Sequence, residues 1–431
     1  MLADTIFALS SGPGRAGVAV VRLSGPGAGA AVTALIGALP PPRQAAVRRL
    51  TFQGAQIDRA LVLWFPAPAS FTGQDVAEFH IHGGRAVREA LFSALSQAGA
   101  RPAEPGEFSR RAVENGKLDL TRAEAVADLV DAQTPAQLRQ ALRQHDGALA
   151  ALVEDWRARL IAALGRAEAA IDFSDDGVGD AEFAAARCAG SEIAEEIQGH
   201  IDRAGRGESL REGLRLTILG PPNAGKSSLI NALAGRDVAI VSDMPGTTRD
   251  VVEARLNLGG YLIAVADTAG VRATADVIEA EGVRRALAHA AGGMTLLLLD
   301  AAAADPRAGL PPDLPPPDLT VWNKADLSPH DGISISLKTG AGVSGLVELL
   351  QQKVQQKLEG GGVALISRAR HRHALDEALT ALRHGMEAPQ TQPELLAEDL
   401  RLALRAVGRI TGRVDVEELL DFVFRDFCIG K

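Results

Sequence analysis

The sequence predicts a multidomain protein that combines an α+β domain, an all-α domain and an α/β domain. Short β-rich runs alternate with glycine and proline turns over residues 1–118, whereas helical periodicity begins at Leu118 and returns near residue 363. Between the helical parts, apolar runs alternate with helical segments, which is typical of a doubly wound sheet. We therefore expect an N-terminal domain (1–118), a discontinuous helical domain (119–212 and 363–431) and an inserted phosphate-loop domain (213–362).

In the N-terminal part, the apolar runs Gly17–Leu23 and Ala60–Phe65 predict two strands. His80 and His82 follow at strand spacing and could bind a metal, but ordinary sheet histidines explain them as well, and a third ligand is not apparent.

Three charged residues of this domain, Arg22, Glu78 and Lys117, lie beside predicted strands or turns. Each could bind a small anionic ligand. Their spacing does not tell whether they converge.

The helical part carries leucines at i, i+3, i+4 and i+7 steps after a break at Pro135. We interpret this stripe as core packing rather than a cofactor site. It comprises Leu138, Leu142, Leu149, Leu152, Trp156, Leu160 and Leu164, and it returns with Leu375, Leu379, Leu382, Leu396, Leu400, Leu404, Val407, Leu419, Val423 and Phe427.

The inserted part opens with a phosphate-binding loop. Residues 220–228 read GPPNAGKSS, which has the GxxxxGK[ST] spacing and lies between an apolar run and a helical pattern. Such glycines let backbone N–H groups converge on an anion at a helix N-terminus. Lys226 would reach the terminal phosphates, and the Ser227 hydroxyl would bind Mg²⁺.

The remaining apolar runs of this domain are bounded by turns and predict a doubly wound sheet with ligands at the carboxyl ends of its strands. The predicted strands are Leu214–Leu219, Val251–Leu258, Tyr261–Ala266, Met294–Leu299 and Leu319–Trp322. The proline-rich piece from Asp305 to Asp318 is most simply a surface loop.

Further polar segments follow in an order that predicts a guanine-nucleotide site. Asp267-Thr268-Ala269-Gly270 closes one strand, where the Asp would support Mg²⁺ and the Gly N–H would sense the γ-phosphate. Asn323-Lys324-Ala325-Asp326 closes a later strand, and its carboxylate can accept two hydrogen bonds from guanine that adenine does not offer. Ser336-Leu337-Lys338 fits the loop behind the base, and Thr248 completes the Mg²⁺ shell.

The water-positioning residue is less obvious. Val271 stands where many GTPases carry glutamine, and valine cannot orient water. Glu279 is the candidate among the carboxylates downstream, although a solvated helix face explains it equally well. A monovalent cation could supply positive charge, with the Asn223 amide and carbonyls of 242–247 as ligands.

Composition limits the other function classes. A net charge of −9 and a pI near 5.6 argue against a broad nucleic-acid surface, but not against docking a structured RNA through a local patch. Two cysteines, Cys188 and Cys428, indicate a reducing compartment. Without an apparent targeting segment or an apolar run near eighteen residues, we expect a cytoplasmic protein that does not associate with membranes. The C-terminal CIGK does not fit a prenylation signal, and Cys428 by itself reads as a leftover cysteine.

Taken together, these motifs resemble the MnmE (TrmE) family of tRNA modification GTPases, within the TrmE-Era-EngA-like group. The similarity rests on GPPNAGKSS, DMPGTTRD, DTAG followed by Glu279, NKAD and CIGK, and on the N-terminal stretches DTIFALSSGPGRAGVAVVRLSG, SFTGQDVAEFHIHGG and RPAEPGEFSRRAVENGKLDLTRAEAVADLVDA. It implies a domain that binds a 5-formyl- or methylene-tetrahydrofolate and dimerises, and a K⁺-dependent GTPase activated when two G domains meet. It also implies a heterotetramer with the FAD-dependent protein MnmG, which adds an aminomethyl or carboxymethylaminomethyl group to the wobble uridine of certain tRNAs.

The resemblance also implies roles for particular residues. By this resemblance, the folate contacts are Arg22, Glu78, Lys117 and Lys431, and the K⁺ ligands are Asn223, Ser242, Met244 (through its carbonyl) and Thr247. The Mg²⁺ ligands are Ser227 and Thr248. Glu279 positions the attacking water, and Cys428 has a functional role. The residues expected at GTP are Asn223, Ala224, Gly225, Lys226, Ser227, Ser228, Ser242, Thr247, Thr248, Asp267, Thr268, Ala269, Gly270, Asn323, Lys324, Asp326, Ser336, Leu337 and Lys338. Met244-Pro245 stands where the family usually has Ile-Ala, and Leu337 replaces its usual alanine.

Two other functions fit parts of the pattern. A regulatory or ribosome-assembly GTPase, as in the Era and EngA families, would act as a binding switch, but neither a KH domain nor a second G domain is visible in the sequence. A folate-handling enzyme with a regulatory G domain is the third interpretation.

Overall fold

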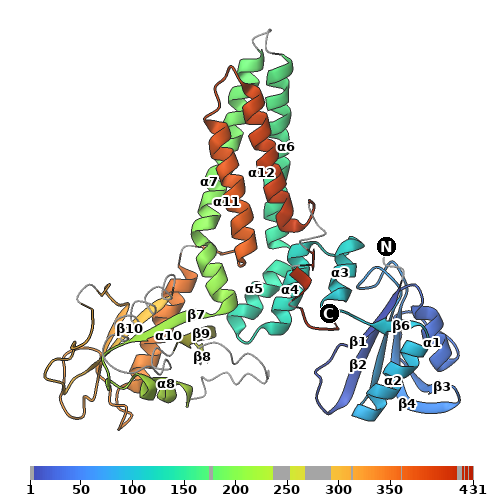
Figure 1. Ribbon diagram of the computed structural model, residues 1–431, viewed down its shortest axis with the longest axis horizontal. Helices are drawn as coiled ribbons and strands as arrows, with labels where there is room; N and C mark the ends of the chain where they lie inside the picture. The colour runs from blue at the N-terminus through green and yellow to red at the C-terminus, as the bar shows by residue number, and fades with distance from the viewer. Residues whose placement is uncertain are drawn as a thin grey trace. The chain divides into compact units, whose positions relative to one another are not determined.

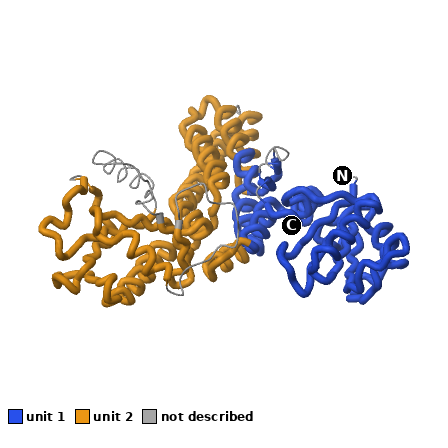
Figure 2. Tube along the Cα trace, turned by 60° about the horizontal axis from the view of Figure 1, so that its bottom comes forward, with its two compact units in different colours: residues 1–130, 144–158, 404–431 blue, residues 131–143, 159–403 orange. Residues whose placement is uncertain are grey.

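The computed structural model describes residues 4–173, 178–235, 253–266, 293–311, 314–360, 362–414, 420–421, 423–425 and 427–430. They form two compact units (Figure 2): residues 1–130, 144–158 and 404–431 in one, and residues 131–143 and 159–403 in the other. Among the described helices, none has both the length and the apolar character needed to cross a bilayer.

The first unit contains a six-stranded sheet in the order β3-β4-β5-β2-β1-β6. Neighbouring strands pair antiparallel except for β1 and β6, which are parallel. The strands are β1 (Thr5–Leu9), β2 (Ala16–Ser24), β3 (Ala46–Phe52), β4 (Ala55–Phe65), β5 (Val76–Gly83) and β6 (Ala100–Pro102).

Helices α1 (Ala28–Ile36) and α2 (Arg85–Gln97) pack on one face of this sheet (Figure 1). Successive strand residues point to opposite faces. Val21 and Leu23 of β2 and Ala77 and Phe79 of β5 are buried beneath the helices. The intervening residues of both strands therefore lie on the other face, and these include Arg22 and the polar residues of β5.

Two more helices of this unit, α3 (Glu107–Glu114) and α4 (Leu120–Asp131), follow the sheet. The end of the chain packs on α4, where Leu420, Val423, Phe424 and Phe427 join the buried side of that helix. Phe424 and Phe427 meet edge to face with ring centroids 4.8 Å apart, a geometry that aromatic pairs favour. This packing holds the C-terminal segment against the N-terminal part of the same unit.

The long helices form the all-α part: α5 (Pro135–His145), α6 (Ala148–Asp172), α7 (Val178–Glu212), α11 (Ala369–Met386) and α12 (Pro393–Thr411). Figure 1 draws α6, α7, α11 and α12 side by side. Ion pairs and hydrogen bonds join neighbouring helices, such as Arg159 to Glu196 and Arg401 to Glu168.

The predicted apolar stripe is partly wrong. Leu149, Trp156 and Leu160 are fully buried, but Leu138 and Leu142 are each 44% exposed. The reason is that α5 ends at His145 and the chain turns at Gly147, which has a φ of +92°. The two leucines therefore belong to a separate helix with its own orientation, and the stripe does not continue across the turn.

The inserted domain is built on a five-stranded sheet in the order β11-β10-β7-β9-β8. Its strands are β7 (Leu214–Leu219), β8 (Glu253–Leu258), β9 (Tyr261–Ala266), β10 (Met294–Asp300) and β11 (Leu319–Asn323). Four strands are parallel, and β8 pairs antiparallel with β9 in a hairpin at the edge. The prediction of a multidomain α+β, all-α and α/β fold with a phosphate-loop domain is confirmed, whereas the proposed domain boundaries stay a prediction.

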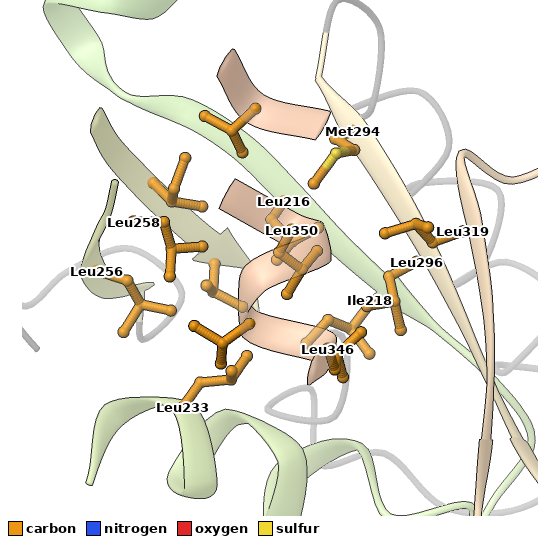
Figure 3. Packing of buried hydrophobic residues seen from close by; sticks show 14 of the residues in the cluster. Leu216, Ile218, Leu233, Leu256, Leu258, Met294, Leu296, Leu319, Leu346 and Leu350 are labelled. Carbon is orange, nitrogen blue, oxygen red and sulfur yellow. The ribbon is translucent and has the colours of Figure 1, made fainter. Parts of the chain in front are cut away.

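The core of this domain lies between the sheet and the helices α8 (Lys226–Ala234) and α10 (Val343–Glu359). Figure 3 shows Leu346 and Leu350 of α10 over Leu216 and Ile218 of β7, with Leu233 of α8 beside them. Burying such leucines contributes roughly 1.5–3 kcal/mol each. This packing fixes the position of β7 relative to the two helices. It therefore also fixes the position of the loop that leads from β7 into α8.

Candidate functional site

The loop between β7 and α8 depends on two glycines in conformations that other residues avoid. Gly220 has a φ of +155°, and a Cβ there would lie 2.2 Å from the carbonyl oxygen of Leu298. Gly225 has a φ of +105°, and a Cβ would lie 2.5 Å from the Nδ2 of Asn323. Both positions therefore exclude a side chain, and the backbone can turn tightly around an anion.

The lysine and serines of this loop stand at the start of α8. The Nζ of Lys226 donates to the carbonyl oxygens of Gly220 and Pro221, at 2.7 and 2.9 Å. Gly225, the residue before the helix, has no side chain to cap the N–H groups of the first turn. Ser227 and Ser228 are exposed there. A helix start with uncapped N–H groups, an ammonium and hydroxyls is suited to phosphates and to a cation bound with them.

Asn323 joins this loop to the segment predicted behind the base. Its Nδ2 donates to the carbonyl oxygen of Ala224 at 2.8 Å, and its Oδ1 accepts from the Leu337 N–H at 3.2 Å. Asn323 is 3% exposed, so both hydrogen bonds are shielded from water. One side chain thus links three predicted motifs.

The segment 336–338 is held by its own turn. The buried Ser336 donates its N–H to the Ala341 carbonyl, and its Oγ accepts from the Thr339 N–H at 3.2 Å. Lys338 is exposed beyond this turn. Leu337 approaches the phosphate loop, because a Cβ on Gly225 would lie 3.3 Å from its Cδ1.

Lys324 and Asp326 follow Asn323 at the carboxyl end of β11. Lys324 has a φ of +63°, and its Nζ lies 2.6 Å from the Oδ2 of Asp300. Burial alone would raise the pKa of Asp300, but hydrogen bonds from Lys324 and the Ala302 N–H outweigh it and lower this pKa. Asp326 is exposed at the same edge.

Several predicted residues lie outside the described part of the chain. These are Ser242, Met244, Thr247, Thr248, Asp267, Thr268, Ala269, Gly270, Val271, Glu279 and Lys431. The described ones from the phosphate loop, from 323–326 and from 336–338 all lie at the carboxyl edge of the sheet. Asn223 is exposed in the loop with a φ of +61°.

In the first unit, Arg22 and Glu78 form an ion pair across two strands. They are opposite each other in the β2–β5 register, and the guanidinium reaches the Oε1 of Glu78 at 2.9 and 3.1 Å. The Arg22 guanidinium also lies 5.5 Å from the Phe71 ring centroid and 5.8 Å from that of Phe108. The pair is partly exposed, at 24% and 19%. It is accessible to a ligand.

Lys117 lies beside the 71–73 segment. A Cβ on Gly73 would lie 3.3 Å from the Cγ of Lys117, and the Asn115 side chain donates to the Thr72 carbonyl at 2.7 Å. Arg22 lies near the Phe71 ring, so both Lys117 and the ion pair border the same short segment. Lys117 itself is exposed.

The C-terminal tail returns to this domain. The Gly106 N–H donates to the carbonyl oxygen of Cys428 at 3.3 Å, and the Ser10 hydroxyl donates to that of Gly430 at 3.0 Å. The thiol of Cys428 is exposed. Because β1 pairs with β2, the tail ends on the sheet that also carries Arg22.

Of the two histidines of β5, His82 is hydrogen-bonded to a protein carboxylate. His82 Nδ1 lies 2.8 Å from Asp58 Oδ1, and His80 Nε2 lies 3.7 Å from Glu78 Oε2. Burial would raise the pKa of Asp58, but hydrogen bonds from His82 and from the Arg59 N–H lower it. No group of three or more His, Cys, Asp or Glu side chains suited to a metal occurs within the described ranges. The contact with Asp58 supports the interpretation of His82 as an ordinary sheet histidine, whereas the buried Nε2 of His80 has no hydrogen-bond partner among the described residues.

Sequence reasoning did not identify Asp300 or Phe71 as part of these sites. Asp300 ends a buried strand, and a charged residue directly after four leucines was the available signal. Phe71 had no comparable signal, since an aromatic residue in a turn is equally well explained by packing in the core.

Comparison with known proteins shows full-length similarity to one group. Residues 5–117 match the family model for the GTP-binding protein TrmE N-terminus, and residues 120–428 match the model for the MnmE helical domain. The chain is 52% identical over 460 residues to the tRNA modification GTPase MnmE of Rhodospirillum rubrum, covering 100% of both chains. It is 50% identical over 435 residues to that of Maricaulis maris, covering 99% of each.

Among solved structures, Era from Aquifex aeolicus bound to GDP and AlF4⁻ is 24% identical with a TM-score of 0.25. The match covers 39% of this chain and 66% of the Era chain.

Proposed function

Because the chain belongs to the MnmE family of tRNA modification GTPases, we propose that it acts in the cytoplasm to modify the wobble uridine of certain tRNAs. It is a GTP hydrolase. With an FAD-dependent partner of the MnmG type it adds an aminomethyl or carboxymethylaminomethyl group. The observation that carries the proposal is the position of Asn323, whose side chain joins the phosphate loop at Ala224 to the base loop at Leu337.

Nucleotide binding follows from the groups at the carboxyl edge of the sheet. The N-terminus of α8 and the ammonium of Lys226 attract the phosphates. The exposed hydroxyl of Ser227 is a suitable Mg²⁺ ligand, with Thr248 as the second protein ligand. Mg²⁺ would neutralise charge between the β- and γ-phosphates. Asp326 accepts the two donors of guanine, and this contact selects GTP over ATP.

Hydrolysis in this family member depends on a cation and a carboxylate. Val271 cannot orient water, so Glu279 is the residue that positions the attacking water. K⁺ would supply the positive charge that an arginine finger provides elsewhere. The Asn223 amide is exposed in the phosphate loop, as a ligand needs to be, and Ser242, Met244 and Thr247 complete the K⁺ set. Two G domains of a homodimer meet to activate this site.

The N-terminal domain binds a tetrahydrofolate derivative, either 5-formyl- or methylene-tetrahydrofolate. The Arg22–Glu78 pair supports this because a carboxylate held by a guanidinium can accept hydrogen bonds from the amino and ring N–H groups of a pterin. Lys117 and Lys431 are positive charges that suit the carboxylates at the other end of a folate. Cys428 lies in the tail that returns to the same domain, and its thiol is accessible.

The experiment compares wobble uridines by mass spectrometry in tRNA from a deletion strain and from strains complemented with variants. Wild type and the charge-matched control Lys353→Ala, which alters an exposed lysine of α10, should restore the modification. Lys226→Ala should not, because the phosphates lose their ammonium. Cys428→Ser should fail to restore the modification although the purified variant hydrolyses GTP. An unchanged uridine profile in the deletion strain would refute the proposed function.

A further inference from the structure

We propose that Asp300, which belongs to none of the nucleotide motifs, is a positioning residue for the guanine base. It holds the side chain of Lys324 in place through a hydrogen-bonded ion pair of 2.6 Å between Nζ and Oδ2. The inference deepens the proposed function, on which it rests, by naming a residue that sets affinity for the base without touching it.

The backbone brings the two residues together. β10 and β11 are parallel neighbours, and Asp300 is directly opposite Asn323 in their register. The Ala301 N–H donates to the Asn323 carbonyl at 2.9 Å, just beyond the end of both strands. The Ala302 N–H donates to the Oδ1 of Asp300 at 3.0 Å, which leaves Oδ2 for Lys324. The carboxylate is therefore oriented from its own strand before it meets the lysine.

Lys324 lies between the two residues that define the base site. Asn323 on one side is fixed to the phosphate loop, and Asp326 on the other side is the predicted guanine acceptor. A φ of +63° lies in the left-handed region, which is unfavourable for a lysine. This conformation turns the backbone so that the side chain runs toward the end of β10 rather than along its own strand.

A lysine side chain has four methylenes and loses much rotamer freedom when a ligand packs against it. The ion pair with Asp300 removes part of that freedom in advance, because the ammonium is already tethered. The pair is only partly exposed, with Asp300 at 19% and Lys324 at 37%, so solvent screens it incompletely. The stem of Lys324 is thus held at the base site ready to cover a face of the ring.

A double-mutant cycle tests this with calorimetric titration of GDP and of inorganic pyrophosphate into the full-length chain. Asp300→Ala should weaken GDP binding about five- to tenfold and leave pyrophosphate binding unaffected, because only the base loses its support. Asp300→Asn, which retains an acceptor oxygen, should recover part of the affinity. In a Lys324→Ala background, Asp300→Ala should have no further effect.

The matched control is Asp305→Asn. Asp305 accepts from the N–H two residues on, at Arg307, as Asp300 does from Ala302, but within the described ranges it pairs with no lysine. The Asp305→Asn variant should bind GDP with the affinity of wild type. The inference is overturned if Asp300→Ala binds GDP within twofold of wild type, weakens pyrophosphate equally, or retains its effect without Lys324. If wild type does not bind GDP at all, the proposed function fails instead.

Discussion

The side-chain amide of Asn323 donates a hydrogen bond of 2.8 Å to the carbonyl oxygen of Ala224, which is 99 residues earlier in the chain. The Oδ1 of the same amide accepts a hydrogen bond from the Leu337 N–H. The phosphate loop, the end of β11 and the base loop therefore share one buried group. The two hydrogen bonds of the Asn323 amide therefore decide whether the three segments form one site.

Replacing this amide should separate the three segments. Asn323→Ala leaves the Ala224 carbonyl and the Leu337 N–H without their partner, and each such loss costs about 1–3 kcal/mol. We expect GDP affinity to fall by at least tenfold and the G-domain unfolding temperature to drop. Titration with GDP and thermal melts measure both, and an affinity within twofold of wild type would contradict the role of Asn323.

Asp326→Asn should change which base is accepted. The amide retains one acceptor oxygen but places a donor where the second carboxylate oxygen accepted, so guanine loses one of its two hydrogen bonds while the additional carbonyl of xanthine gains a donor. Affinity should shift from GTP toward xanthosine triphosphate, measured by competition between the two nucleotides. Asp331→Asn, at an exposed residue a few positions on, is the control and should retain the preference for GTP.

Exchange of K⁺ for Na⁺ should slow GTP hydrolysis, because a smaller cation fits poorly between ligands spaced for K⁺. Asn223→Ala should remove most of the stimulation by K⁺ at saturating GTP. Asn231→Ala, an exposed asparagine in the helix that follows the loop, should be stimulated like wild type. The measurement is the rate of phosphate release in K⁺ and in Na⁺ salt. Equal rates in the two salts would rule out the K⁺ assignment.

Gly207→Ala should destabilise α7, although alanine ordinarily favours a helix by about 1 kcal/mol over glycine. A Cβ at Gly207 would lie 2.0 Å from the carbonyl oxygen of Ile366, in the segment where the chain leaves the G domain. Such overpacking costs about 1–3 kcal/mol. Gly205→Ala in the same helix meets no atom within 4 Å and should stabilise instead. Thermal melts of the two variants should shift in opposite directions.

Glu107→Gln should destabilise the first unit in a pH-dependent way. Burial raises the pKa of Glu107, but hydrogen bonds from Arg101, the Glu104 N–H and Arg111 outweigh it and hold this pKa below its ordinary 4.5. A lowered pKa means that the stabilisation is complete above pH 4.5 and is lost as the pH falls through the folded-state value.

The loss for Glu107→Gln should therefore be about 3 kcal/mol near neutral pH and shrink below pH 4.5. Unfolding in urea at several pH values measures it. Glu104→Gln, at an exposed carboxylate three residues earlier, should differ little from wild type at any pH. A loss for Glu107→Gln that stays constant with pH would mean that the effect is steric.

Local sequence patterns were sufficient to predict the position of most strands of the G domain. Four of the five predicted strands of the G domain match the observed strands to within one residue at either end, because buried runs with turns at both ends are unambiguous. The helical stripe failed at Leu138 and Leu142, since periodicity counted across a turn assumes one helix axis where the chain has two. His82 illustrates a third limit: spacing placed it on one face with His80, but its partner Asp58 comes from the neighbouring strand β4.

The sequence by itself determined the family and was sufficient to predict the nucleotide loop and the guanine motif, because these depend on residue types at short, fixed spacing. Only the tertiary structure decided that Arg22 faces Glu78, that Asn323 reaches Ala224 and that Asp300 holds Lys324. Those contacts depend on strand order and register. Strand order and register are set by how whole faces of the sheet are buried, which is a property of distant residues acting together rather than of any local pattern.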